Sequence, residues 1–99
     1  MKLENAAKQL NALGNPTRLQ VCRILVRAGD SGLSVRRLRE RLDIAASTLS
    51  HHLDRLIWTG LVTQEHQAMA LICRANFRAI DALLGYLIDE CCVDAGLSA

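Results

Sequence analysis

The sequence predicts a mainly α-helical fold that carries one small β-hairpin. Apolar residues recur at helical spacing along most of the 99-residue chain, and turn-forming residues separate these segments. Only residues 62–74 read as two short strands around a turn. A chain of this length is enough for one core, so we expect a single domain over residues 1–99.

Two helices are predicted in the first third of the chain. The first covers residues 2–13, where apolar residues follow a helical period, and Gly14 ends it. The stretch "NPTRL" begins the second, because Asn15 can cap a helix and Pro16 takes the favoured first position. The segment "AGDSG", residues 28–32, is a break.

A short helix, a turn and a longer helix follow. Ser34 can cap the short helix, and the chain turns near Asp43. The longer helix is predicted over residues 46–59, with its leucines in one stripe and Gly60 at its end.

The last predicted helix follows the hairpin. The hairpin turn is expected near residues 66–68, and the helix covers residues 76–92 with Asn76 as its cap. The element order is therefore four helices, a hairpin and a helix (α-α-α-α-β-β-α), which is typical of a winged helix-turn-helix. In such a motif the second of the paired helices, here 46–59, enters the major groove of DNA, and the hairpin, here 62–74, is the wing.

The first and last helices carry more apolar surface than one small core needs. Leu3 and Leu10 belong to one stripe, and the stripe of the last helix runs from Ile80 to Cys91. A dimer is a natural way to cover such surface in a small domain. We therefore expect a homodimer built by residues 2–13 and 76–92.

Composition argues against a membrane protein and favours a cytoplasmic one. No run approaches the roughly 18–20 uncharged apolar residues of a membrane span, and "MKLENAAKQL" is too polar for a secretory signal. The four cysteines are then expected to be reduced thiols. The net charge of +2 is unevenly distributed along the chain. Arginines dominate residues 16–55, whereas the charged residues from Asp81 onward are all acidic. One half of the chain can therefore face phosphate.

The outer face of the 46–59 helix favours a surface that reads DNA. With the leucines inward, its outer turns carry Ser47, Ser50, His51 and Asp54 or Arg55. Short hydroxyls and imidazoles can reach phosphates and base edges. Adjacent helical residues point about 100° apart, so His51 and His52 are poorly placed to chelate one metal. A simple solvated face is the alternative.

The short helix before it carries four arginines, Arg36, Arg37, Arg39 and Arg41. In this architecture that helix crosses the DNA backbone, so one or two of them are expected to touch phosphate. Arg55 is expected to add to this attraction. The alternative is a solubilising face with internal ion pairs, such as Arg36 with Glu40.

Two stretches, "ALGNPTRLQVCRILV" and "IAASTLSHHLDRLIWTGLV", resemble the ArsR/SmtB family of bacterial repressors, and the similarity covers roughly residues 3–92. The resemblance implies a dimeric winged helix-turn-helix repressor that binds double-stranded operator DNA and releases it when an inducer binds. In such proteins the helix matching 46–59 reads the operator. The carried-over contact positions are Ser47, Thr48, Ser50, His51 and His52, although His52 could instead brace the helix against the domain.

The chain departs from the family pattern at two places. The family commonly has Ser-Gln where this chain has Ala45 and Ala46. This change removes a hydroxyl cap worth about 1 kcal/mol of helix stability and one base contact. Similar proteins usually carry a basic, Gly-containing wing tip, but this chain reads "EHQAM", with Ala68 where Gly would accept a positive φ. The wing is therefore expected to attract phosphate less strongly.

The adjacent Cys91 and Cys92 are the expected inducer site. They resemble a subgroup of arsenic repressors that has a Cys-Cys pair at the end of the last helix, followed by a third cysteine that this chain lacks. Trivalent arsenic is thiophilic; inorganic arsenite prefers three sulfurs, whereas two saturate methylarsenite. We expect no constitutive cofactor, As(III) or methylated As(III) as inducer, and no zinc site of the family's type, because the last helix has no His. Cys22 and Cys73 lie in apolar runs and are expected in the core.

Two other functions stay open. One is a thiol-redox or reactive-sulfur-responsive repressor of the same fold, for which Cys22 is one residue out of register. The other is a ligand-independent DNA-binding or protein-interaction module, which the missing third cysteine favours. An enzyme is not expected, because the hydroxyl–imidazole neighbours lie on one short exposed helix with no acid to orient a base.

Overall fold

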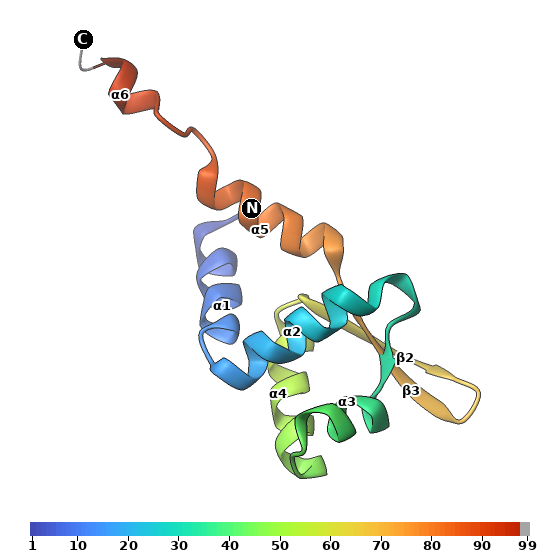
Figure 1. Cartoon of the computed structure of the whole chain (residues 1–99). Helices are drawn as coiled ribbons and strands as arrows, with labels where there is room; N and C mark the ends of the chain where they lie inside the picture. Colours follow the sequence, from blue (N-terminus) through green and yellow to red (C-terminus); the bar gives the residue numbers. More distant parts are fainter. Residues whose placement is uncertain (98–99) are drawn as a thin grey trace.

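The computed structural model describes residues 1–97, and its element order confirms the predicted winged helix-turn-helix (Figure 1). The first four α-helices are α1 (Leu3–Leu13), α2 (Pro16–Ala28), α3 (Val35–Leu42) and α4 (Ala46–Trp58), with a short 3-10 helix at Gly29–Ser31 between α2 and α3. Strands β2 (Val62–Gln67) and β3 (Ala70–Ala75) follow, and then α5 (Phe77–Ile88) and the short α6 (Val93–Leu97). Within residues 1–97, none of the helices is long and apolar enough to cross a bilayer.

The expected side-chain caps begin three of the helices. Asn15, Ser34 and Asn76 each accept a backbone N–H from the first turn of α2, α3 and α5, respectively. Pro16 takes the first position of α2, where a missing N–H costs nothing. Helix α4 starts without such a cap, because the side chain of Ala45 has no acceptor.

The hairpin belongs to a three-stranded antiparallel sheet of order β1-β3-β2. The sequence did not indicate β1 (Leu33–Ser34), because two residues are too few to show a strand period. Val62 pairs with Ala75 and Gln67 with Ala70, so the turn consists of residues 68–69, close to the predicted 66–68. Ala68 has a φ of 53°, the left-handed conformation that a glycine would adopt without strain.

The core is built from the buried side of each helix. The leucines of α4, at positions 49, 53 and 56, are at most 2% exposed. They belong to one cluster with buried side chains of α2, α3, the loop before β2, and α5, namely Val21, Leu25, Leu38, Leu61 and Leu83. This packing holds α4 against the body and turns its other face to solvent.

The last helix ends earlier than predicted, at Ile88 rather than at residue 92. The backbone of Asp89 is extended (ψ 139°), and Glu90 and Cys92 have positive φ values of 60° and 67°. Two acids at this position face the negative end of the helix dipole, which disfavours further turns. The prediction of one helix over 76–92 is therefore wrong: the cysteine pair lies in the turn between α5 and α6, which projects from the body in Figure 1.

Candidate nucleic-acid interface and thiol pair

One face of α4 is polar and exposed. Ser47, Thr48, Ser50 and His51 are all exposed, and Arg55 is exposed one turn further along. Because the leucines of α4 fill the core, these side chains share the opposite side of the helix. The structure therefore brings the sequence-predicted contact residues, except His52, to one open surface.

His52 is half-buried and faces α2. Nη1 of Arg18 lies 3.4 Å from Nδ1 of His52; a guanidinium only donates, so Nδ1 accepts and the ring proton is on Nε2. Arg18 is only 9% exposed, and its Nε donates to the carbonyl of Ala12 at 2.6 Å. Burial, followed by the charges of Arg18 and His51, lowers the pKa of His52. His52 is thus a neutral link between α4 and α2, which favours its bracing role.

The two imidazoles have separate surroundings. Their ring centroids lie 5.9 Å apart and the ring planes are tilted by 59°. His51 is exposed, whereas His52 contacts Arg18. Over residues 1–97, no three His, Cys, Asp or Glu side chains are grouped so that they could hold a metal ion.

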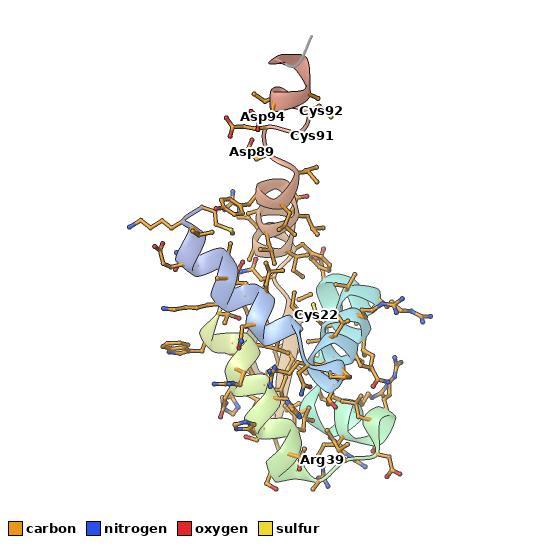
Figure 2. The ribbon with its side chains drawn as sticks, turned by 90° about the vertical axis from the view of Figure 1, so that its left-hand side faces the viewer. Cys22, Arg39, Asp89, Cys91, Cys92 and Asp94 are labelled. Atoms are coloured by element: carbon orange, nitrogen blue, oxygen red, sulfur yellow. The ribbon has the colours of Figure 1, made fainter. Side chains whose placement is uncertain are left out.

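Helix α3 adds positive charge next to α4. Its four arginines, Arg36, Arg37, Arg39 and Arg41, are exposed. Nε of Arg36 lies 3.4 Å from Oε1 of Glu40, as the alternative interpretation expected, but these side chains are 88% and 64% exposed. A solvated pair of this kind is weak and easily exchanged for another anion. Figure 2 shows Arg39 at the end of the molecule where α3 and α4 meet.

The wing offers little net positive charge. Glu65 of β2 forms an ion pair with Arg74 of β3, and Nε of Arg74 also donates to the carbonyl of Asp30 at 2.7 Å. At the tip, Met69 is fully exposed and no lysine or arginine is present. The exposed positive charge beside the polar face of α4 therefore comes from α3 and α4 rather than from the wing.

The four cysteines fall into two groups. Cys91 and Cys92 are exposed, and their Sγ atoms are 3.3 Å apart. Cys22 and Cys73 are 6% and 0% exposed, and burial raises the pKa of both thiols, although a hydrogen bond from Gln64 partly opposes this at Cys73. Their predicted place in the core is confirmed. Figure 2 shows Cys91 and Cys92 at the opposite end of the molecule from Arg39, with Cys22 between them.

Sequence reasoning missed two buried polar residues, Arg18 and Gln9. Nε2 of Gln9 donates to the carbonyl of Thr59 at 3.0 Å, and so joins α1 to the end of α4. Helical spacing could have predicted the burial of Arg18. It lies three, four and seven residues before the buried Val21, Cys22 and Leu25, and therefore on the same stripe of α2.

Comparisons with known proteins agree with the fold. A family profile described as a helix-turn-helix domain matches residues 13–65. ArsR of Halobacterium salinarum, whose name refers to an arsenical resistance operon, is 42% identical over 82 residues, covering 83% of this chain and 62% of that protein. The transcriptional activator HlyU of Vibrio cholerae is 33% identical over 87 residues, covering 85% of this chain and 78% of that one.

Solved structures show the same likeness. HlyU of Vibrio cholerae has a TM-score of 0.72 at 31% identity and covers 93% of this chain and 99% of its own. A homodimeric winged helix-turn-helix domain of Mycobacterium bovis, described as a possible ArsR-family regulator, has a TM-score of 0.70 at 26% identity over 89% of this chain and 82% of its own. These relatives are transcription regulators, so the expectation that the chain is not an enzyme is confirmed.

Proposed function

The chain belongs to the ArsR family of winged helix-turn-helix transcriptional regulators, and from this we propose that it is a homodimeric repressor that binds operator DNA through α4 and leaves it when a thiophilic inducer binds Cys91 and Cys92. The observation that carries the DNA half of the proposal is the exposed polar face of α4, backed by three buried leucines and flanked by the arginines of α3. The observation that carries the inducer half is the exposed pair of thiols.

Specific recognition is assigned to the hydroxyls and the imidazole on α4. Truncating Ser50 and His51 to alanine should weaken binding to the operator, because a good base contact is worth about 1–3 kcal/mol. The operator can be selected from a random duplex library, and affinity measured by fluorescence anisotropy. Gln20→Ala, an exposed change on α2, is the matched control. Unchanged affinity after alanine substitution of Ser47, Ser50 and His51 together would show that another surface reads the DNA.

Phosphate attraction is assigned to Arg36, Arg37 and Arg55. Changing Arg36 or Arg37 to glutamine should weaken binding to all duplexes alike and reduce the dependence of affinity on salt, because each phosphate contact releases counterions. A loss confined to the operator sequence would contradict this assignment.

His52 is assigned the bracing role, so His52→Gln should change operator affinity less than His51→Gln does.

The thiol pair fits trivalent arsenic better than zinc. A structural zinc ion takes four ligands, whereas the pair supplies two. Trivalent arsenic is thiophilic and takes at most three. Residues 1–97 offer no third ligand beside the pair, so a methylated or aryl arsenite, which needs two sulfurs, suits the site better than inorganic arsenite. The name of the Halobacterium relative also favours an arsenical.

Coupling to DNA has to run along α5, since the thiols lie at the far end of the molecule from Arg39 (Figure 2). Helix α5 carries the apolar face proposed to pair the subunits. Drawing both thiols onto one atom would reorder the turn after Ile88 and could shift that pairing. A coupling free energy of about 1–3 kcal/mol is sufficient, provided that the inducer prefers one state over the other.

The inducer test uses Cys91→Ser/Cys92→Ser. Methylarsenite or phenylarsenite should release the wild type from operator DNA at least as well as arsenite does, and zinc should act poorly. The double variant should bind DNA and ignore the arsenical, whereas Cys22→Ala should respond like the wild type. Release of the double variant by methylarsenite would move the site to another thiol. If no inducer releases the wild type, the chain is a ligand-independent DNA-binding module.

A thiol-redox response is the second candidate, favoured by the 3.3 Å between Sγ of Cys91 and Sγ of Cys92. A peroxide would oxidise the two thiols to a vicinal disulfide and would itself be reduced to water and an alcohol, or to two waters if it is hydrogen peroxide. Cys22 does not suit such a switch, because it is buried and its thiol pKa is raised. Peroxide-driven release that is reversed by dithiothreitol, without a response to arsenicals, would favour this candidate over the first.

The direction of regulation belongs to the proposal as well, because the Vibrio relative is named an activator. A promoter–reporter fusion that contains the selected operator should be silenced by the wild type and restored by the inducer. Expression that rises with the protein would identify an activator instead.

A further inference from the structure

A groove of about 600 Å³ lies where α1, the end of α4 and α5 meet. Its lining includes Asn5, Lys8, Gln9, Trp58, Thr59 and Ala82. A smaller groove of about 170 Å³ shares Lys8, Trp58 and Thr59 with it and adds Arg55. Neither lining contains an acidic side chain, so this surface combines apolar walls with positive charge.

Trp58 is the centre of this surface. It is the last residue of α4 and is 80% exposed, an uncommon position for the largest aromatic side chain unless it contacts a partner. Nζ of Lys8 lies 5.6 Å from the centroid of the indole ring. Within residues 1–97, neither Lys8 nor Arg55 forms an ion pair. Trp58 and two cations without ion pairs, Lys8 and Arg55, therefore lie on one surface, which is suited to a planar anion.

Gln9, one of the residues that line the groove, has a buried acceptor without a partner. Gln9 is 7% exposed, and its Nε2 donates to the carbonyl of Thr59 at 3.0 Å. Its Oε1 has no hydrogen-bond partner among residues 1–97. Such a group is costly to leave unpaired, and a hydroxyl or N–H would satisfy it.

The groove does not coincide with the exposed leucines of α1 and α5. Lys8 and Leu10 are two residues apart on α1, which places them about 200° apart around the helix. Ala82 and Leu84 stand in the same relation on α5. Subunits that pair through the leucines would therefore leave the groove open.

We propose that this groove binds a small planar aromatic acid that carries a hydroxyl or ring N–H. The ring stacks on Trp58, the carboxylate pairs with Lys8, and the donor meets Oε1 of Gln9, whose amide turns toward the groove because this oxygen is buried when the groove is empty. The occupant contacts α1 and α4 together, since Gln9 holds the carbonyl of Thr59 at the end of α4. Binding therefore biases the position of α4, and this regulatory part rests on the proposed DNA-binding function.

Binding is tested without DNA, because Trp58 is the only tryptophan of the chain and its fluorescence reports on the groove. 4-Hydroxybenzoate should quench it saturably, and the dissociation constant should agree with calorimetry. Benzoate, which lacks the donor, should bind about tenfold more weakly. 4-Hydroxybenzyl alcohol, which lacks the charge, should bind at least about fivefold more weakly than 4-hydroxybenzoate.

Variants separate the groove from nonspecific binding. Lys8→Gln should weaken 4-hydroxybenzoate about fivefold, whereas Lys2→Gln, the other lysine of the chain, should not. Gln9→Met should bind 4-hydroxybenzoate and benzoate alike. Absence of saturable quenching by 4-hydroxybenzoate in the wild type, or equal binding by wild type and Lys8→Gln, overturns the site; if Gln9→Met does not fold, the comparison of the two acids on the wild type decides.

The regulatory part is tested by operator binding at saturating 4-hydroxybenzoate. The dissociation constant for DNA should change several-fold for the wild type and for Cys91→Ser/Cys92→Ser, whereas Lys8→Gln should need about fivefold more 4-hydroxybenzoate for the same change. Unchanged DNA affinity with the groove filled overturns the regulatory role. If the protein binds no DNA at all, the proposed function has failed, while the fluorescence titration still decides whether the groove binds the acid.

Discussion

At the scale of single residues, the pKa of His52 links the stability of the fold to pH. Burial, Arg18 and His51 lower this pKa, so the unfolded chain takes up the proton more readily than the folded one. The stabilising effect of neutral His52 is complete above the ordinary pKa of about 6.5 and is lost as the pH falls through the lowered value. Acid should therefore loosen the link between α4 and α2.

We expect His52→Gln to flatten this pH dependence. Glutamine can still accept a hydrogen bond from Arg18 but does not titrate, so the free energy of unfolding should fall less between neutral pH and mildly acidic pH than it does for the wild type. Urea denaturation at several pH values measures this. His66→Gln, on the exposed wing, is the control for the replacement of a histidine by glutamine. Equal slopes for wild type and His52→Gln would contradict the assignment.

The burial of the two polar residues could be predicted from the sequence, but their hydrogen-bond partners could not. Helical spacing places Arg18 and Gln9 on buried stripes, beside Val21 and Ala6. Their partners, however, are far along the chain: His52 is 34 residues from Arg18, and Thr59 is 50 residues from Gln9. Long-range pairs of this kind depend on how the helices pack, which no local pattern reports.

At the scale of elements, helix starts were predictable because a cap is a local interaction. Asn15, Ser34 and Asn76 accept N–H groups three residues on, as expected. The ends of elements were less predictable. The apolar period of the sequence continues as far as Cys91, but the acids at 89 and 90 end α5 before the cysteine pair.

The uncapped start of α4 can be repaired. Ala45 has β-region angles (φ −64°, ψ 149°), which are those of a capping residue, and its side chain accepts no hydrogen bond. Ala45→Ser should therefore raise the free energy of unfolding by about 1 kcal/mol. Urea denaturation tests this, with Ala45→Val as the control that adds bulk without an acceptor. A serine variant no more stable than the valine variant would argue against capping.

The unforeseen strand β1 depends on Gly32. Its φ is 65°, and a Cβ there would lie 2.3 Å from the carbonyl oxygen of Cys73 and 2.7 Å from Cγ of Arg74. Gly32→Ala should therefore cost about 3 kcal/mol or more, because the β1–β3 pairing has to shift. Gly29→Ala is a matched control: its φ is 70°, but the added Cβ meets nothing within 4 Å, so the cost should be about 1 kcal/mol. Equal losses in thermal unfolding would show that only φ matters.

At the scale of the whole molecule, the fold is more extended than a compact domain of the same number of residues. Its radius of gyration is 15.9 Å, against about 13 Å for a compact chain of 100 residues. The end of α5 and all of α6 project from the body in Figure 1. The apolar stripe of α5 was predictable from the sequence, but its exposure was not: Leu84, Leu87 and Ile88 are 56%, 54% and 71% exposed.

These side chains lead to the prediction on assembly. Burying them against a second copy would contribute up to about 1.5–3 kcal/mol for each fully covered leucine, so Leu84→Glu/Leu87→Glu should convert a dimer to a monomer. Sedimentation velocity at micromolar concentration measures this, with Leu19→Glu as control, because Leu19 is 45% exposed on α2. A monomeric wild type, or a dimeric double variant, would contradict the predicted interface.

Operator binding should fail together with the dimer. Two reading helices about 34 Å apart contact successive major grooves at once, and a monomer can occupy only one half-site. The Leu84→Glu/Leu87→Glu variant should therefore bind the full operator about as weakly as the wild type binds a single half-site, while its folded α4 surface stays intact by circular dichroism. If the monomeric variant keeps full operator affinity, recognition does not require the paired subunits. An inducer that acts on subunit pairing at the end of α5 would then not change the affinity for DNA.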